Sequence, residues 1–531
     1  MDRRTPVLLL LTTPDGQSAL QSGYLEIRKG ENDDLVKGRT KPFARDMDPY
    51  GCVGARECDV ELPPDHMSDL PSMKLYAIGR DELPLEHIGE EGDSQENSQK
   101  PYGPKQVQRS HMLNGIQVAA VHPLGSQMGA CTVMFQAGSR VERDGELGAT
   151  HFIRAMSGSS GRAYSGYGKM RTLHQRGCYL TCSSDRQSIA YTLRCPLDDF
   201  SEMKYYLLDT AARCCFHEWE LEDIKPFIKD NLVRIHPKQR LLDLLQRALW
   251  GGPLGNSMFC EEDRIGHMTT DHLKGYMTNF GTKNCSIASF GLPFEETMKL
   301  AESLSMEFTY DKTCGREPMT SFPRGDCEYY DLGQGSDTWV AVGVPGAGTS
   351  DICSTLKHAL VAMACGVDYA QVGQHTLDRI AQTPLCSMAD DLYTEYRAFN
   401  ISYSETGLFG VMARTRPSTA EKVARVVVAF LSNVDKLNAD HIDVAKKRLK
   451  LNLALHEEDC VQVAEGMALQ IANDVQIDGT QQYFSIIDSI PNEEILLTAN
   501  EISSKQSYMA IAVVGDTSAV PPDVDLIKNL L

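Results

Sequence analysis

The same order of predicted helices and strands occurs twice along the chain. This internal repeat restricts the possible folds more than any other feature of the sequence. In the first copy, a helix predicted to begin at Ile265 is followed by a strand over residues 286–290. In the second, a helix predicted to begin at Ile487 is followed by a strand over residues 509–514. Each helix opens with polar and acidic residues, as capping and the helix dipole favour. The chain of 531 residues is also too long for one ordinary domain.

Two earlier pairs of segments extend the repeat. A strand over residues 189–195 and its following helix correspond to a strand over residues 408–413 and a helix over residues 420–431. The amphipathic helix over residues 220–233 corresponds to the one over residues 440–455. Strands that alternate with paired helices indicate the α+β class, with one sheet in each of two homologous domains.

The repeat and the composition together predict the domain boundaries. We expect the first domain over residues 105–310 and the second over residues 329–531, joined by a linker over residues 311–328. Residues 1–104 are acidic, rich in Pro and Gly, and end in a polar run without periodicity. We expect them to be a disordered N-terminal extension or an artefact of the gene model. They do not resemble a transit peptide, which would be rich in Arg and poor in acidic residues.

The composition is that of a soluble globular protein, with 42% hydrophobic and 23% charged residues. The formal net charge of −20 argues against a nucleic-acid partner, because phosphate binding needs clustered Lys and Arg. No apolar run approaches the roughly 18–20 residues of a membrane-spanning helix. We therefore expect at most a peripheral association with a membrane.

The 16 cysteines form neither a disulfide framework nor a zinc-finger pattern. No Cys-x-x-Cys occurs, and Cys178 and Cys182 have no second pair at a matching spacing. We therefore expect reduced, mostly buried thiols in a reducing compartment.

Residues 148–156, Gly-Ala-Thr-His-Phe-Ile-Arg-Ala-Met, resemble the zinc-binding helix of the pitrilysin/insulinase-like metallopeptidases. In that family, His-x-x-Glu-His places two imidazoles on one helix face, and the Glu between them activates a metal-bound water. Here His151 is kept, whereas Arg154 replaces the Glu and Ala155 replaces the second His. The spacing of the family's third ligand, a Glu, leads to Asn231. The resemblance implies a protease fold with a degenerate zinc site, without metal, cofactor or catalysis.

Four further stretches of the chain resemble sequences of the mitochondrial branch of the family. They are Leu113–Val118, Gln136–Arg140, Arg264–Gly266 and Phe399–Gly410. The last is the longest, and it is similar to a stretch in the core protein II group of the ubiquinol–cytochrome c reductase (complex III). The resemblance covers about residues 110–531.

This resemblance implies a non-catalytic core subunit with a structural and assembly role, peripheral to the mitochondrial inner membrane on its matrix side. Each domain would be a mainly antiparallel sheet flanked by helices. The implied partners are core protein I, with which such a subunit forms a heterodimer, cytochrome b, cytochrome c1, and the iron–sulfur protein or its presequence. No transmembrane span is implied.

A second member of the same branch stays open as an alternative. The non-catalytic α-type subunit of the mitochondrial processing peptidase binds presequences for a zinc-bearing β subunit, and it carries a Gly-rich loop early in its second domain. The corresponding residues 364–373 contain two glycines. Without the flexibility of a glycine run, these residues do not favour the loop function.

The remaining signals favour structural roles. A single neutral imidazole binds zinc weakly, so we interpret His151 as a hydrogen-bonded helix residue. His267 and His272 are five residues apart and do not share a helix face. The Ser- and Gly-rich residues 157–169 lack the spacing of a phosphate-binding loop. We interpret the basic residues within 446–450 as the solvated face of a helix.

Overall fold

The computed structural model describes residues 107–123, 126–308, 320–366, 384–387, 393–475, 477 and 479–520. The predicted N-terminal extension, residues 1–104, lies outside the described residues, as do residues 311–319 of the predicted linker.

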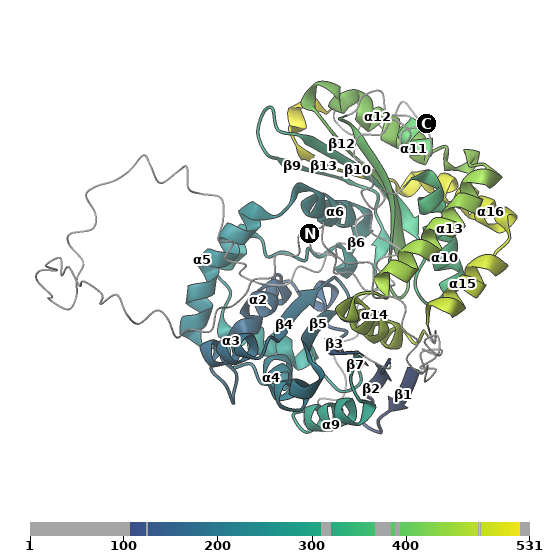
Figure 1. Cartoon of the computed structure of the whole chain (residues 1–531). Helices are drawn as coiled ribbons and strands as arrows, with labels where there is room; N and C mark the ends of the chain where they lie inside the picture. The colour runs from purple at the N-terminus through teal and green to yellow at the C-terminus, as the bar shows by residue number, and fades with distance from the viewer. Residues whose placement is uncertain are drawn as a thin grey trace, which may run out of the picture. The chain divides into compact units, whose positions relative to one another are not determined.

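One sheet contains six strands in the order β1-β2-β7-β3-β5-β4 (Figure 1). Its strands are β1 (Val107–His111), β2 (Gln117–Val121), β3 (Met128–Phe135), β4 (Tyr179–Ser184), β5 (Ile189–Pro196) and β7 (Cys285–Phe290). All neighbouring strands are antiparallel except β2 and β7, which run parallel. The sheet therefore brings β7, from the end of the predicted first domain, between two of its earliest strands.

The second sheet contains five strands in the order β9-β13-β10-β12-β11. Its strands are β9 (Cys327–Asp331), β10 (Thr338–Gly346), β11 (Glu395–Ser402), β12 (Gly407–Thr415) and β13 (Ala510–Gly515). Its one parallel pair is β9 and β13, in the position that β2 and β7 hold in the first sheet. The second sheet thus repeats the order and directions of the first without β1. A short pair, β6 (Trp250–Gly251) and β8 (Phe322–Pro323), lies outside both sheets.

Helices flank the two sheets. They are α2 (Ala149–Ala155), α3 (Gly166–Gln175), α4 (Phe200–Ala212), α5 (Glu218–Arg234), α6 (Pro237–Leu249), α7 (Glu262–Ile265), α8 (Thr270–Tyr276), α9 (Phe294–Ser305), α10 (Ile352–Cys365), α11 (Pro384–Ser387), α12 (Ala420–Leu431), α13 (Ala439–His456), α14 (Cys460–Ala472), α15 (Thr480–Ser489) and α16 (Asn492–Ser504). The predicted fold class, α+β with mainly antiparallel sheets flanked by helices, is confirmed. The domain boundaries stay a prediction.

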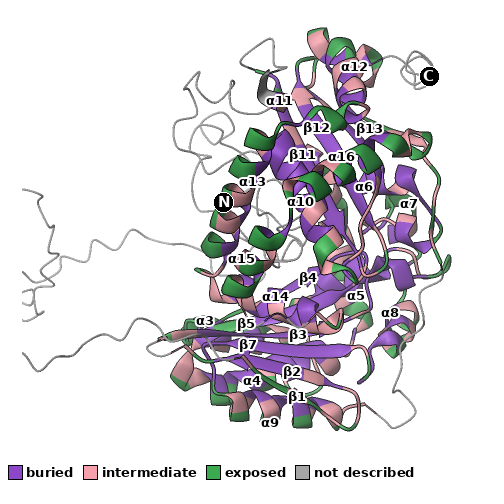
Figure 2. Ribbon diagram, turned by 90° about the vertical axis from the view of Figure 1, so that its right-hand side faces the viewer, coloured by how far each residue is buried: buried purple, intermediate pink, exposed green. Residues whose placement is uncertain are grey.

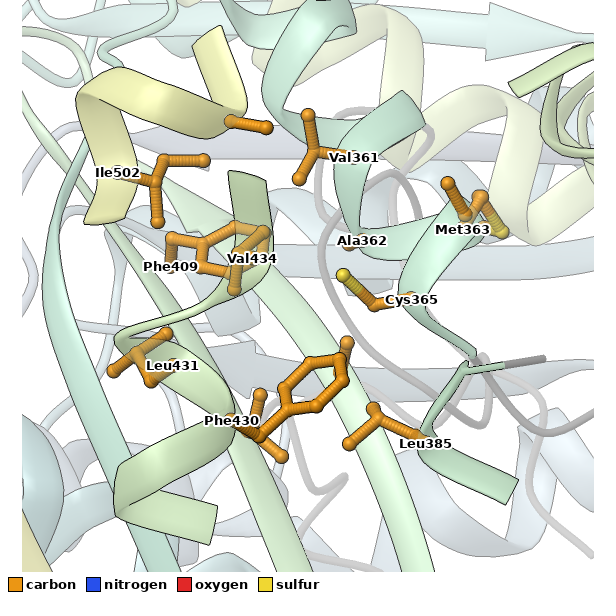
Figure 3. Close-up of a cluster of buried hydrophobic side chains, with 14 of the residues drawn as sticks. Val361, Ala362, Met363, Cys365, Leu385, Phe409, Phe430, Leu431, Val434 and Ile502 are labelled. Atoms are coloured by element: carbon orange, nitrogen blue, oxygen red, sulfur yellow. The ribbon is translucent and has the colours of Figure 1, made fainter. Parts of the chain in front are cut away.

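One face of each sheet is covered by helices from the same half of the chain. In the first sheet, α4 packs on β5, and α9 packs on β2 and β7. In the second sheet, α12 packs on β10 and β12, and α10 packs on β11. Figure 3 shows part of this second core, where Val361 of α10, Phe409 of β12 and Leu431 of α12 belong to one buried cluster with Ile502 of α16. Apolar residues at helical spacing on α12 and α10 account for these contacts.

The other face of each sheet is covered by a helix from the opposite half of the chain. α6, which precedes the predicted linker, packs on β13, β10 and β9 of the second sheet. α14, from the second half, packs on β3, β7 and β2 of the first sheet (Figure 1). Both sheets are therefore buried on two faces, and Figure 2 shows their strands mainly in the colour of buried residues.

Small side chains bring α14 close to the first sheet. Ala468 is fully buried in a cluster with Ala288, Ala190 and Met134. The backbone carbonyl of Ala468 also accepts a hydrogen bond from the Ser286 hydroxyl of β7 at 3.0 Å. A second buried hydrogen bond runs from the Thr192 hydroxyl of β5 to the carboxylate of Glu465 on α14, at 2.8 Å. The helix thus touches the sheet through small apolar side chains and direct polar contacts.

Both helices of the predicted repeat begin later than predicted. Ile265 is the last residue of α7, and the next helix, α8, begins at Thr270. Ile487 lies in the last turns of α15, and α16 begins at Asn492, after Pro491. Proline has no backbone N–H and does not continue a helix from its preceding turn, so Pro491 separates the two helices. Proline fits before the first turn of α16, whose acidic residues are Glu493 and Glu494.

The cysteines of the described residues are free, and most of them are buried. Burial raises the pKa of the Cys131 thiol to about 12, so it is protonated at neutral pH. In this part of the chain the cysteines serve as small apolar residues.

Enlarging the contact between α14 and the first sheet is expected to destabilise the protein. Ala468→Leu inserts three extra carbon atoms between packed methyl groups and should lower the free energy of unfolding by about 1–3 kcal/mol, measured by urea unfolding. Ala439→Leu, at the exposed start of α13, is the matched control and should change it by less than about 0.5 kcal/mol. Equal effects of the two substitutions would contradict the close packing of α14.

Candidate functional site

The degenerate zinc motif forms the short helix α2, and a buried glutamate caps its first turn. The carboxylate of Glu142 accepts hydrogen bonds from the backbone N–H groups of Gly148 and Thr150, at 2.9 and 2.8 Å. It accepts a third from the Thr150 hydroxyl at 2.6 Å. Gly148 has a φ of +93°, and a Cβ there would lie 2.6 Å from the side chain of Cys260. α2 therefore begins where Glu142 satisfies its free N–H groups and where glycine is required.

His151 is buried on α2 and serves as a hydrogen-bond acceptor for the backbone. Its Nδ1 accepts from the N–H of Cys260 at 3.1 Å, and its side chain is 1% exposed. Burial, followed by the positive charge of Arg154, holds the pKa of His151 well below its usual range. The ring is therefore neutral, and Nε2 carries the proton because Nδ1 is the acceptor.

Arg154 lies one turn further along α2, and its guanidinium is buried between β4 and Phe259. Its side chain is 3% exposed, and Nη1 donates to the hydroxyl of Ser184 at 2.7 Å. The guanidinium carbon lies 5.8 Å from the ring centre of Phe259. Burial lowers the pKa of Arg154 to about 10, so the group stays charged at neutral pH. A charged guanidinium cannot act as a general base and repels a divalent cation.

Ala155 and Asn231 complete the four positions of the motif. Ala155 is partly buried against the apolar core of the first sheet, and its methyl group offers no atom to a metal. Asn231 lies on α5 and is partly exposed. The structure therefore brings His151 and Arg154 together around Phe259, whereas Ala155 and Asn231 add no charged ligand.

The residues at these four positions do not fit a zinc ion. Structural and catalytic zinc sites use three or four Cys, His, Asp or Glu ligands, and His151 is the one such residue here. Its Nδ1 is engaged by Cys260, and the cation of Arg154 lies on the same helix face. Over the residues that the structure describes, no group of three or more His, Cys, Asp and Glu is placed to hold a metal ion.

Sequence reasoning missed four residues of this site: Glu142, Ser184, Phe259 and Cys260. Ser184 ends β4, and Phe259 and Cys260 precede α7, so all three reach α2 only through the fold. Glu142 had a weak signal, because an acidic residue shortly before a helix start is typical of a cap.

The histidines near residue 270 have a structural role. His272 and Thr269 form a reciprocal cap at the start of α8, in which each side chain bonds to the other residue's backbone. This arrangement uses Nδ1 of His272 and explains why a histidine lies three residues after the cap.

The Ser- and Gly-rich segment after α2 is tied down by internal contacts. The hydroxyl of Ser160 donates to Glu220 of α5 at 2.7 Å. The ammonium of Lys169 lies 3.5 Å from the carboxylate of Asp209, and both side chains are almost fully buried. The polar groups of this segment are thus used within the protein rather than presented to a phosphate.

The basic run on α13 is only partly a solvated face. Lys446 donates to the carbonyl of Ile490 at 2.6 Å, and Lys450 lies 2.5 Å from the carboxylate of Asp488. Both contacts hold α13 to the C-terminal end of α15, where cations are favoured. The interpretation of the run as wholly solvated was therefore incomplete.

The segment that corresponds to the Gly-rich loop begins at the end of α10. Gly366 follows Cys365 with a φ of +132°, a conformation that glycine adopts without strain. Residues 367–373 lie outside the described residues.

Comparison with known proteins agrees with the motif. Residues 117–262 match the family described as Insulinase (Peptidase family M16). The chain therefore carries a peptidase M16 family domain, and the predicted family is confirmed.

Similarity to individual proteins extends over most of the chain. The chain is 24% identical over 424 residues to the Homo sapiens protein "Cytochrome b-c1 complex subunit 2, mitochondrial", covering 77% of this chain and 90% of that protein. It is 23% identical over 433 residues to the Arabidopsis thaliana protein "Probable mitochondrial-processing peptidase subunit alpha-1, mitochondrial", covering 79% and 83%. It is 22% identical over 424 residues to "Mitochondrial-processing peptidase subunit beta" of Neurospora crassa, covering 77% and 88%.

Removing the cap of α2 is expected to destabilise the protein strongly. Glu142→Ala leaves two buried N–H groups and a hydroxyl without their acceptor, so the free energy of unfolding should fall by about 2–4 kcal/mol in urea unfolding. The control is Glu218→Ala, which removes an exposed acid from the first turn of α5 and should cost less than about 0.5 kcal/mol. A loss below 1 kcal/mol (roughly one ordinary hydrogen bond) for Glu142→Ala would contradict the assigned cap.

Proposed function

We propose that this chain is a non-catalytic core subunit of the mitochondrial ubiquinol–cytochrome c reductase (complex III). The observation that carries the proposal is the buried guanidinium of Arg154 in the place of the metallopeptidase general base. Similarity to cytochrome b-c1 complex subunit 2 over 90% of that protein's length supports it. The two-sheet fold is kept while the chemistry of the zinc helix is replaced, as expected of a structural subunit.

The local chemistry explains why such a chain does not hydrolyse peptides. Activation of a water needs a metal or a base with a pKa near neutrality, and Arg154 provides neither. His151 is neutral, but its acceptor atom is engaged by the backbone of Cys260. The residues of α2 therefore stabilise the first domain instead of activating a nucleophile.

The proposed role places the chain at the matrix side of the mitochondrial inner membrane as a peripheral subunit. Its partners would be core protein I, cytochrome b, cytochrome c1, and the iron–sulfur protein or its presequence. In this role the chain would bind no cofactor. It would support the membrane subunits and their assembly. The proposal also includes the predicted division into domains at residues 105–310 and 329–531, with the linker at 311–328.

Among the residues that the structure describes, no helix is both long and apolar enough to cross a bilayer.

The α-type subunit of the mitochondrial processing peptidase is the second candidate. Similarity to the Arabidopsis thaliana α-1 subunit over 83% of that protein favours it. In this case the chain would bind presequences for a zinc-bearing β subunit and would leave the cleavage to that partner. The two glycines within residues 364–373 argue against it, because a flexible loop needs a longer glycine run.

Native-gel fractionation of mitochondria, with mass spectrometry of the bands, tests the proposal. We expect the chain to migrate with cytochrome b and core protein I. Migration with a zinc-bearing β subunit and without cytochromes would instead support the processing-peptidase role. Migration with neither would contradict both.

Restoring the family's ligands should restore metal binding at most. We expect the triple variant Arg154→Glu, Ala155→His and Asn231→Glu to bind zinc, measured by metal analysis after gel filtration, without efficient cleavage of a presequence peptide. Catalysis also needs a positioned substrate and oriented outer residues, which these three substitutions do not supply. Stoichiometric zinc in the unmodified protein would overturn the degenerate site, and rapid cleavage by the variant would show that the ligands were the only defect.

A further inference from the structure

One buried hydrogen-bond donor on α2, Nε2 of His151, lacks an acceptor within the described residues, and the buried guanidinium of Arg154 beside it has one hydrogen-bond partner there. Arg154 is 3% exposed, and Ser184 is the single hydrogen-bond partner of its guanidinium within the described residues. Nε2 of His151 is buried and has no hydrogen-bond partner in the same part of the chain. Ser184 is 1% exposed. Buried donors of native proteins are almost always paired, so this group calls for a ligand.

The proton positions make all three groups hydrogen-bond donors. Nδ1 of His151 accepts from Cys260, so the neutral ring presents an N–H at Nε2. The Ser184 oxygen accepts from Arg154, so its own hydroxyl hydrogen is free to donate elsewhere. His151 and Arg154 are three residues apart on α2 and therefore share a face of the helix.

The ring of Phe259 lies beside two of these groups, His151 and Arg154. Its centre lies 5.8 Å from the ring centre of His151 and 5.8 Å from the guanidinium carbon of Arg154. An aromatic ring beside the donors keeps water away, and a lower local dielectric strengthens a hydrogen bond between charged groups.

The charge of Arg154 is not balanced by a carboxylate in the described structure. The other buried arginines have such a partner: Arg186 lies 2.7 Å from Asp243, and Arg140 lies 3.3 Å from Glu405. The group that most favours the charged form of Arg154 is Cys182, whose own pKa is raised by burial, so that thiol is neutral. A buried cation without a counter-charge is costly, and an anion would remove that cost.

We propose that Arg154, His151 and Ser184 form a binding site for one small carboxylate, such as formate, acetate or the terminal carboxylate of a peptide. The guanidinium edge suits a planar carboxylate, whose two oxygens accept parallel hydrogen bonds. The imidazole N–H and the serine hydroxyl supply neutral donors to the remaining lone pairs. The site binds an anion at the place where a catalytic relative binds a cation, and it depends on side-chain geometry rather than on membership of complex III.

Formate is the probe for the first test, on the full-length chain. We measure the melting temperature and the ¹³C NMR linewidth of labelled formate during a titration at constant ionic strength, held with a bulky sulfonate salt. The expected result is a saturable rise in melting temperature and a broadened formate signal. Arg154→Met should weaken the apparent affinity roughly tenfold or more, because it removes the charged donor. Ser184→Ala should weaken it roughly threefold, because it removes one neutral donor.

A matched variant and a second anion separate this site from general salt effects. Arg140→Met removes another buried arginine, already paired with Glu405, and should leave the formate response within about twofold of the original. An unchanged response in Arg154→Met, or an equal loss in Arg140→Met, would overturn the proposal. A saturable response to phosphate with none to formate would do the same. An added peptide with a free C-terminus that competes with formate, while its amidated form does not, would identify a peptide terminus as the natural source.

Discussion

The reciprocal covering of the two sheets by α6 and α14 is the contact on which the rest of the structure depends. Leu241, Leu245 and Leu249 of α6 are fully buried in a cluster with Ala512 and Val514 of the second sheet. Burying one leucine contributes about 1.5–3 kcal/mol, so this helix is a major part of the second domain's stability although it belongs to the first half of the chain. α14 has the converse role on the first sheet. Neither sheet has two covered faces without the other half.

Polar contacts fix the position of α6 between the two halves. Asp243 pairs with Arg186 in the turn between β4 and β5, at 2.7 Å and with both groups almost fully buried. Gln246, one turn further, accepts a hydrogen bond from the Tyr403 hydroxyl that follows β11. A buried ion pair adds little net stability, but breaking it leaves an unpaired charge, so misplaced arrangements of α6 are disfavoured. Apolar burial supplies the stability of this contact, and the polar pairs define its geometry.

Much of the fold could be predicted from the sequence. What could not be predicted is the exchange of helices, in which α6 and α14 each cover the sheet of the opposite half of the chain. Alternating and helical periodicities identified the strands around residues 189–195 and 408–413 and the helices that follow them. The leucines of α6 recur at helical spacing, yet periodicity does not say which sheet such an apolar face will cover. The helix break at Pro491 was missed because the pattern of the repeat was given more weight than the proline.

The candidate site, like the fold, could be predicted from the sequence in part. That the zinc motif is degenerate is a prediction from Arg154 and Ala155, since those residue types cannot replace a base or a ligand. The environment of Arg154 could not be predicted, because Ser184 and Phe259 reach it from strands and loops distant in the sequence. Local patterns report residue chemistry, whereas the partners of a buried side chain are set by tertiary packing.

The exchange of α6 and α14 between the two sheets also bears on how a chain of this kind can arise. A single half, with one sheet and one exchanged helix, would leave one face of its sheet open to water and its own helix without a sheet to cover. It could close both only by pairing with a second copy of itself, each lending its helix to the other around a twofold axis. Duplication and fusion of such a gene would turn a symmetric dimer into a monomer without changing a contact. After fusion the two sheets are free to diverge, so one copy can carry α2 and its altered site while the other keeps only the shared scaffold.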